Sequence, residues 1–286
     1  MPEGDTVWLT ARRLHDGLAG RTLTRAELRV PRLATVELRG RTVLAVVPRG
    51  KHLLTRVSGG LTLHSHLRMD GAWRVFAAGE RWRGGPGHQI RAILGTEAGT
   101  AVGYRLPVLD LLRTAHEERV VGHLGPDLLG PDWDEAAALA RLAAAPERPL
   151  GDALLDQRNL AGIGNVYLAE LCFLARVTPW VPVGELPRFA PAPAEPLARL
   201  LRSAARLLAA NRDRFDRITT PPGERRSRLF VYGRAGRPCL VCGTPIRVVG
   251  DAHGEPGRER PTYWCPRCQH GPSGPAAGHP ARRPTR

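Results

Sequence analysis

The spacing of apolar residues changes along the chain, and each change indicates a different kind of element. Residues 5–18 place four apolar side chains on one helical face before Gly20 ends the pattern, namely Val7, Ala11, Leu14 and Leu18. This spacing predicts an amphipathic helix. From residue 22 to about 106, short β-rich runs alternate with glycine-containing turns. Such runs predict a β-sandwich or barrel-like domain of roughly 110 residues, against which the first helix packs.

The predicted strands are rich in valine, isoleucine, leucine, threonine and aromatic residues, which favour half-buried strands. They comprise residues 22–30, 35–40, 42–47, 53–57, 61–67, 72–76, 89–94 and 100–106. Turns such as Ser58-Gly59-Gly60 separate them, as expected for short antiparallel strands.

The sequence beyond this region is helical in pattern as far as residue 210. Residues 123–134 contain two Gly-Pro steps and are expected to form a linker. Helical patterns then cover residues 134–145, the end of a short helix at 152–157, residues 165–174 and, after a proline-rich loop, residues 197–210. We expect Asp132 to cap the first of these helices, with Glu135 completing a capping box.

The charge of the chain favours a polyanionic partner. Lysine and arginine number 42 against 27 aspartate and glutamate, which gives a formal net charge of +15. Each neutralised phosphate of a nucleic acid releases condensed counterions, so this excess favours DNA or RNA binding. The alternative is a compositional bias, because alanine, glycine, proline and arginine are all abundant. The sequence has no apolar run long enough to span a membrane and no signal-peptide pattern, so we expect a cytoplasmic protein.

Four of the five cysteines form two C-x-x-C pairs separated by 22 residues: Cys239, Cys242, Cys265 and Cys268. In a reducing compartment this pattern predicts one structural zinc ion held by four thiolates, with a β-hairpin between the pairs. Four protein ligands leave no open coordination position, so the zinc is not expected to be catalytic. Cys172 lies in an apolar helical run and is expected to be an inert buried thiol.

A glycine-containing turn at residues 160–165 leads into the predicted helix at 165–174. Free backbone N–H groups at such a helix start can bind an anion, and Asn165 can cap the helix and donate to a phosphate. The alternative is an ordinary turn between two helices in which Asn165 serves only as a cap.

Five motifs in order give the chain a specific resemblance. They are the MPEG start, RGKHLL at 49–54, LHSHLRMDG at 63–71, LLDQRNLAGIGNVYLAE at 154–170 and RPTYWCPRCQH at 260–270. Together they resemble the family of formamidopyrimidine-DNA glycosylase and endonuclease VIII up to about residue 270, and the endonuclease VIII branch more closely.

The resemblance implies an α+β multidomain fold. Its parts are an N-terminal helix and β-sandwich catalytic domain at 1–120, a helix–two-turn–helix DNA-binding domain at 121–232, a zinc finger with a β-hairpin at 233–272 and a disordered tail at 273–286. The spacer between the cysteine pairs is longer than usual for the family, which indicates an extended loop at about 251–259.

The resemblance also implies catalytic roles for three residues. Pro2, exposed as a secondary amine once Met1 is removed, corresponds to the nucleophile that forms an iminium ion with the sugar. Glu3 corresponds to the acid–base group. The alternative is a solvated carboxylate that stabilises the start of the first helix, and the two roles can coexist. Lys51 corresponds to a lysine that contacts phosphate beside the lesion and supports catalysis.

Four further residues correspond to positions that bind DNA. Arg68 and Met69 occupy the place of the residues that fill the gap left by a flipped base. Asn165 and Arg260 correspond to residues that hold the DNA backbone. Asp70 stands where the endonuclease VIII pattern has a bulkier aromatic residue. This difference affects how Arg68 and Met69 would fill the gap and which base is preferred.

The implied function is a bifunctional DNA glycosylase and abasic-site lyase that prefers oxidised pyrimidines and cleaves the strand by β,δ-elimination. Its partner would be double-stranded DNA with oxidised bases or abasic sites, bound by a nucleoid-associated monomer. Two alternatives remain: a glycosylase for oxidised purines, and a non-catalytic protein that binds damaged DNA.

Overall fold

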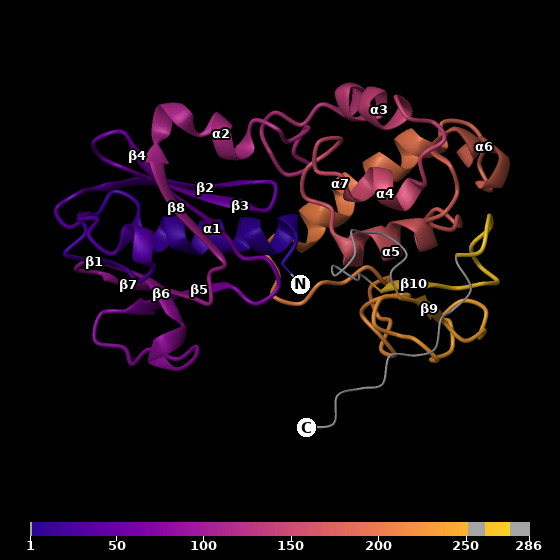
Figure 1. Cartoon of the computed structure of the whole chain (residues 1–286). Coiled ribbons are helices and arrows are strands. Elements are labelled where there is room, and N and C mark those ends of the chain that lie inside the picture. The colour runs from indigo at the N-terminus through magenta and orange to yellow at the C-terminus, as the bar shows by residue number, and fades with distance from the viewer. Residues whose placement is uncertain (1, 251–260, 275–286) are drawn as a thin grey trace.

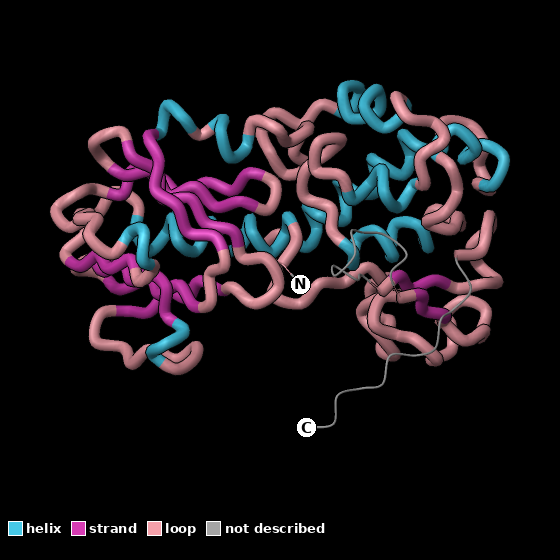
Figure 2. Tube along the Cα trace, in the orientation of Figure 1, coloured by secondary structure: helices cyan, strands magenta, loops and turns pink. Residues whose placement is uncertain are grey.

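A computed structural model describes residues 2–250 and 261–274 of the chain. Figure 1 shows a β lobe and a helical lobe, with α1 (Gly4–Leu18) running from their junction into the β lobe. The same view in Figure 2 shows most strands in the β lobe, where α1 and a few short helices also lie, and most of the other helices in the helical lobe, with a small strand pair near the C-terminal end. The α+β arrangement expected from the sequence is confirmed.

The β lobe consists of two four-stranded antiparallel sheets, and α1 contacts both of them. The first sheet has the order β2 (Val43–Arg49), β3 (His52–Val57), β4 (Leu61–His66) and β8 (Val108–Arg113). The second has the order β1 (Arg25–Leu28), β6 (Ile90–Gly95), β7 (Gly99–Tyr104) and β5 (Ala72–Ala77). The predicted apolar face of α1, including Val7 and Leu14, is buried in the core of this lobe.

One predicted strand does not form, and one strand of the structure was not predicted. Residues 35–40 form no strand, because Leu38 turns into the core and Gly40 reverses the chain at a φ of +82°. The strand β8 was missed because Asp110 interrupts its apolar run, yet it pairs with β4 along its whole length. Cross-strand hydrogen bonds are decided by the neighbouring strand, which local alternation does not reveal.

The short helix α2 (Glu118–Val121) follows β8 and lies over the β lobe, where Val121 packs with Leu54 of β3. The helical lobe contains helices α3 (Glu135–Ala143), α4 (Leu150–Leu155), α5 (Asn165–Leu174), α6 (Leu186–Phe189) and α7 (Pro196–Asn211). Short 3₁₀ helices lie at Pro31–Leu33, Gly87–Gln89, Thr114–His116 and Val183–Glu185. In α5, nine of ten residues are buried, so this helix lies at the centre of the lobe rather than on its surface. Among the described residues, none of the helices has the length and apolar character needed to cross a membrane.

The capping box expected at Asp132 and Glu135 was wrong. The helix α3 begins at Glu135, and the carboxylate of Asp134 accepts the N–H of Ala137 at 3.0 Å. Asp132 instead accepts a hydrogen bond from the guanidinium of Arg49 at 2.7 Å. The residue directly before the helix is the one whose carboxylate reaches the free amides of the first turn.

The predicted hairpin between the cysteine pairs is confirmed. Strands β9 (Arg247–Val249) and β10 (Thr262–Trp264) pair in antiparallel fashion beside α5. Residues of this finger pack with Phe173 of α5 and with Phe230 of the preceding segment. The expected loop at 251–259, Arg260, and most of the tail predicted at 273–286 lie outside the described residues.

Candidate active site

The carboxylate of Glu3 binds the N-terminus of α5. Its Oε1 accepts the N–H of Val166 at 2.7 Å, and its Oε2 accepts the N–H groups of Gly164 at 2.8 Å and Tyr167 at 3.3 Å. Glu3 is fully buried, so the interpretation of a solvated carboxylate at the start of α1 was wrong. Amides at the start of a helix are unpaired within the helix and carry partial positive charge, which a carboxylate stabilises.

Two glycines allow this close approach. A side chain at Gly164 would place its Cβ 2.5 Å from the carboxyl carbon of Glu3. Gly162 has a φ of +112°, and its carbonyl accepts the N–H of Gly4 at 2.9 Å. The turn at 160–165 therefore does hold an anion, but the anion is a carboxylate of this chain.

Asn165 does not cap α5, contrary to the sequence-based expectation. Gly164 occupies the capping position and Asn165 is the first helical residue. The side chain of Asn165 is 1% exposed, and its amide nitrogen donates to the carbonyl of Pro261 at 2.8 Å. Its Oδ1 is buried and has no hydrogen-bond partner among the described residues. Asn165 thus joins α5 to the finger immediately after Arg260.

Lys51 reaches the same turn from the β lobe. Its Nζ donates a hydrogen bond to the carbonyl of Ile163, which also accepts the side chain of Gln157 at 3.0 Å. The neighbouring Gly50 donates its N–H to the carboxylate of Asp127 at 2.6 Å. Burial raises the pKa of Asp127, although the hydrogen bond from Gly50 opposes this effect. The β2–β3 hairpin is thereby joined to the helical lobe, with Lys51 bound to Ile163 and Glu3 bound to the next residue, Gly164.

Pro2 directly precedes Glu3 and is half-buried. Because Glu3 is fixed on α5 and Gly4 on Gly162, the backbone after Pro2 is held on both sides. The three candidate catalytic residues, Pro2, Glu3 and Lys51, are therefore gathered around residues 162–166.

A buried ion pair lies in the first turn of α1. The guanidinium of Arg217 donates two hydrogen bonds to Asp5, at 2.7 and 2.5 Å, and lies over the ring of Tyr167. Burial alone would lower the pKa of Arg217, but the hydrogen bond to Asp5 and the charges of Glu3 and Asp5 outweigh it and raise that pKa. Burial and the charge of Asp5 likewise raise the pKa of Tyr167, whose hydroxyl donates to Asp5 at 2.8 Å.

Arg68 and Met69 form an exposed turn at the end of β4. Met69 is 60% exposed, so its side chain is accessible at the tip of the turn. Arg68 has a φ of +46°, and the N–H of Gly71 donates to the carbonyl of Leu67 at 2.9 Å to close the turn. The carbonyl of Asp70 accepts a hydrogen bond from Arg105. The turn is therefore ordered even though Asp70 replaces the aromatic residue of the endonuclease VIII pattern.

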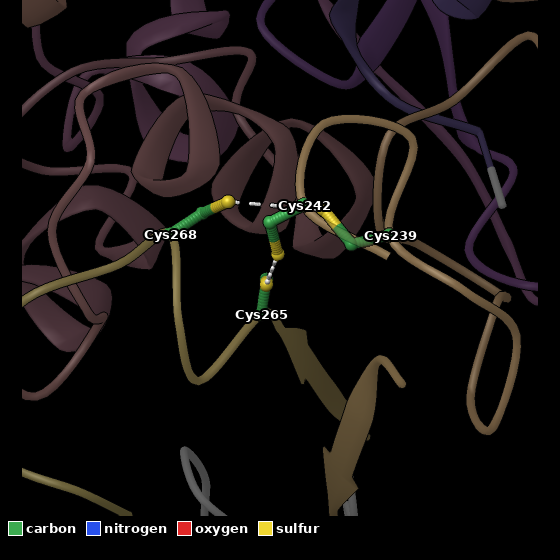
Figure 3. Close-up of side chains that lie close together, drawn as sticks. All are labelled: Cys239, Cys242, Cys265 and Cys268. Carbon is green, nitrogen blue, oxygen red and sulfur yellow. Dashed lines mark hydrogen bonds between the residues drawn. The ribbon is translucent and has the colours of Figure 1, made fainter. Parts of the chain in front are cut away.

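The four cysteines of the finger converge, as Figure 3 shows. The Sγ atoms of Cys239 and Cys268 are 3.8 Å apart, and those of Cys242 and Cys265 are 3.4 Å apart. Zinc–sulfur bonds of about 2.3 Å in a tetrahedron place sulfur atoms roughly 3.8 Å from one another. The four thiols therefore fit one tetrahedral metal ion. Cys172 is buried in α5, and burial raises the pKa of its thiol, as expected for an inert side chain.

Sequence reasoning missed several residues that assemble the site. Asp5, Asp127 and Arg217 carry no motif of their own in the sequence. A further one is Glu170, whose buried carboxylate accepts the N–H groups of Phe230, Val231 and Tyr232 at 2.8, 2.9 and 2.9 Å and the hydroxyl of Thr219. The signal for Glu170 was an acidic residue in the middle of an apolar helix, because such a residue needs buried partners.

Comparisons with known proteins identify the family of two parts of the chain and relatives of the whole chain. Residues 1–105 match the formamidopyrimidine-DNA glycosylase N-terminal domain, and residues 124–190 match the H2TH domain of the same enzyme. The probable endonuclease 8 2 of Streptomyces coelicolor is 68% identical over 286 residues, covering 100% of both chains. The DNA-(apurinic or apyrimidinic site) lyase Nei2 of Mycolicibacterium smegmatis is 48% identical over 269 residues, which is 94% of this chain and 99% of that protein.

Among solved structures, the MutM (Fpg) protein of Thermus thermophilus superimposes with a TM-score of 0.73 at 32% identity, covering 95% of this chain and 100% of that one. The match in sequence therefore extends to the arrangement of both lobes. The chain belongs to the formamidopyrimidine-DNA glycosylase and endonuclease VIII family of DNA glycosylases and abasic-site lyases.

Proposed function

We propose that this protein is a bifunctional DNA glycosylase and abasic-site lyase of base excision repair that acts through Pro2. The observation that carries the proposal is that the carboxylate of Glu3 accepts hydrogen bonds from the amides of α5. These hydrogen bonds fix the backbone next to Pro2. DNA binding alone would not require Pro2, Glu3 and Lys51 together.

The chemistry requires removal of Met1, which frees the secondary amine of Pro2. A terminal α-amine has a pKa near ~8, so a useful fraction is neutral at physiological pH. Its lone pair forms a bond to C1′ of the damaged nucleotide, and the C1′–base bond breaks with its electron pair leaving on the base, which takes up a proton. The Pro2 nitrogen loses its proton, and the C1′–O4′ bond then opens with protonation of O4′, which leaves an iminium ion between Pro2 and C1′. Loss of a C2′ proton from the resulting iminium ion expels the 3′ phosphate, and a second elimination expels the 5′ phosphate. Water then hydrolyses the iminium ion and releases Pro2.

Glu3 is proposed to transfer protons during these steps. Its two carboxylate oxygens accept three backbone hydrogen bonds, and an ionised carboxylate has about four acceptor positions in all. Acceptor capacity therefore remains for a proton at the sugar. Because the α5 amides hold the group rigidly, proton transfer needs no rearrangement of its side chain.

The basic residues are proposed to hold the DNA backbone beside the lesion. Lys51 binds the carbonyl of Ile163, one residue before Gly164, whose N–H binds Glu3. Asn165 and Arg260 are proposed as further backbone contacts, and DNA binding would require the Asn165 side chain to leave Pro261. The net charge of +15 supports binding to a polyanion.

Arg68 and Met69 are proposed to fill the gap that a flipped base leaves in the duplex. Met69 is apolar, flexible and exposed at the tip of its turn, which suits insertion between bases. Arg68 would then approach the unpaired partner base.

The cysteine cluster is proposed to hold one zinc ion through Cys239, Cys242, Cys265 and Cys268. A closed set of four thiolates favours zinc and excludes an open position for water, so its contribution would be structural. The finger would then serve as the platform for Arg260.

Oxidised pyrimidines are proposed as the preferred substrates, since the YWCPRCQH motif and the Arg-Gly-Lys element resemble endonuclease VIII. Oxidised purines are the alternative within the same fold. Duplexes with matched sequences and single lesions of either class separate the two, because the ratio of single-turnover rates reports the preference directly.

Borohydride trapping tests the proposed chemistry. The wild type should form a covalent adduct with abasic DNA, and mass spectrometry should place that adduct at the N-terminal amine. Pro2→Gly keeps an amine, so part of its lyase activity should persist while base excision falls steeply. An adduct on Lys51 with none at Pro2 would overturn the assignment of the nucleophile, and no adduct at all would favour a passive binder.

A further inference from the structure

The turn that carries Met69 has an uncommon backbone. Arg68 adopts a φ of +46°, in the left-handed region that residues with a side chain rarely enter. Such a conformation persists only where surrounding contacts hold it. The contacts that hold Arg68 therefore determine how rigidly the next residue, Met69, is positioned.

One contact comes from His66, the last residue of β4. The backbone N–H of Arg68 donates to Nδ1 of His66 at 2.9 Å, two residues earlier in the chain. This bond satisfies the amide that the left-handed conformation directs back toward the strand. His66 is thus fixed at the base of the turn on a strand paired on both sides, with β3 and with β8.

A second contact holds the other end of the turn. Nε of Arg105 donates to the carbonyl of Asp70 at 3.0 Å, and the backbone N–H of Arg105 donates to the carbonyl of Gln89 at 2.7 Å. The turn is therefore held at Arg68 and at Asp70, with Met69 between the two points and exposed.

The bond at Arg68 requires a neutral imidazole with its proton on Nε2, because Nδ1 must accept. Burial lowers the pKa of His66 to about 4, and the positive charges of Lys51 and Arg68 act in the same direction. The ring of His52 packs edge-on against that of His66, with centroids 4.9 Å apart. At neutral pH, His66 therefore has the protonation state that the turn needs.

We propose that His66 is a positioning residue for base flipping, because its Nδ1 holds the turn that presents Met69 to the duplex. The proposal rests on the proposed function, in which Met69 fills the gap left by the extruded base. A preorganised wedge enters the stack without first ordering its own backbone, which lowers the cost of flipping.

Two substitutions distinguish the nitrogens of His66. Asparagine places an acceptor oxygen near the position of Nδ1, whereas glutamine extends its amide toward the position of Nε2. His66→Asn should keep the bond to Arg68, and His66→Gln should lose it. Met69→Ala is the reference for a turn without a wedge.

The measurement uses duplex DNA with an abasic-site analogue and 2-aminopurine next to the unpaired base. Insertion of Met69 should unstack the fluorescent base and raise its emission on binding. We expect His66→Asn to retain most of the wild-type rise, and His66→Gln to resemble Met69→Ala. Single-turnover excision by His66→Gln should fall roughly tenfold, as expected for the loss of one hydrogen bond.

Retention of the signal by His66→Gln with its loss in His66→Asn would assign the role to Nε2 and overturn the proposal. Wild-type signals from both variants would overturn it as well. The fluorescence readout needs binding alone, so it decides on His66 even if borohydride trapping fails for the wild type. A wild-type rise that persists in Met69→Ala would refute the wedge itself while leaving the Pro2 chemistry to its own test.

Discussion

Arg217 forms a two-bond ion pair with Asp5, although the two residues are separated by 212 positions in the chain. The pair connects α1 to the segment after α7, and Tyr167 of α5 completes it. Three segments thus meet one helical turn from Pro2, and the alignment of the candidate active site depends on them.

Removing one partner of this ion pair should be strongly destabilising. Arg217→Met leaves the Asp5 carboxylate buried without its counter-charge, and breaking a buried pair costs about 3–5 kcal/mol. Urea denaturation of Arg217→Met, Asp5→Asn and the double variant measures the coupling. The double variant should be more stable than the sum of the single losses implies, and simple additivity would contradict the coupling.

Glu3→Gln should separate excision from strand cleavage. Its amide NH₂ cannot accept the α5 amides as a carboxylate does, and it cannot transfer a proton. We expect base excision to fall by about 10²–10⁴-fold, the range for an acid–base group. Cleavage of a preformed abasic site should fall less, because the base has already left. Equal retention of both activities would refute the role given to Glu3.

Glu170→Gln should detach the finger from α5. Its carboxylate accepts three backbone N–H groups from residues 230–232, and hydrogen bonds to a charged group contribute about 1.5–3 kcal/mol each. Limited proteolysis should cut the segment around Phe230 faster than in the wild type. Glu185→Gln is the matched control, since Glu185 is exposed and makes only a 3.9 Å ion pair with Arg188. Similar protection in both variants would contradict the anchoring role.

Zinc removal should weaken DNA binding through the finger. Elemental analysis should find one zinc per chain, and Cys242→Ser or chelation should release it and unfold the finger. Arg260→Ala should keep the zinc and lower the salt dependence of binding by roughly one phosphate contact. Unchanged affinity and salt dependence in Arg260→Ala would limit the finger to a structural role.

The histidines at the paired ends of β3 and β4 should make the protein less stable in acid. Burial lowers the pKa of His52 to about 3 and that of His66 to about 4, both from an ordinary value of 6.5, and the charge of His66 adds to the effect on His52. Below pH 6.5 the unfolded chain therefore binds more protons than the folded one, and stability decreases as pH falls.

Each of the two histidines should contribute roughly 1.4 kcal/mol per pH unit within this window, and neither should contribute to the slope well above a pH of about 6.5. Urea denaturation between about pH 4.5 and about pH 8, which spans the titration of an ordinary histidine, measures the slope. His52→Gln removes one of these groups and should make the slope shallower, while His66 and His64, whose pKa burial also lowers, continue to contribute. A slope that His52→Gln leaves unchanged would show that other groups cause it.

Local patterns in the sequence determined the elements whose apolar residues recur at a clear period. Short-range spacing of apolar residues predicts the helices α1, α5 and α7, and the C-x-x-C motif predicts the cysteine cluster. The resemblance to a known family then supplied candidate roles for Pro2, Glu3 and Lys51. None of this required knowledge of how the lobes pack.

The tertiary structure decided which groups meet. Glu3 caps a helix that begins 162 positions later at Asn165, Lys51 donates to Ile163, and Arg217 pairs with Asp5 across the chain. A helix start accepts any carboxylate that reaches its amides, so a local rule pointed to Asn165 while packing brought Glu3. Periodicity reports the side that an element buries, but hydrogen bonds between distant segments form only when folding brings their partners within about 3 Å.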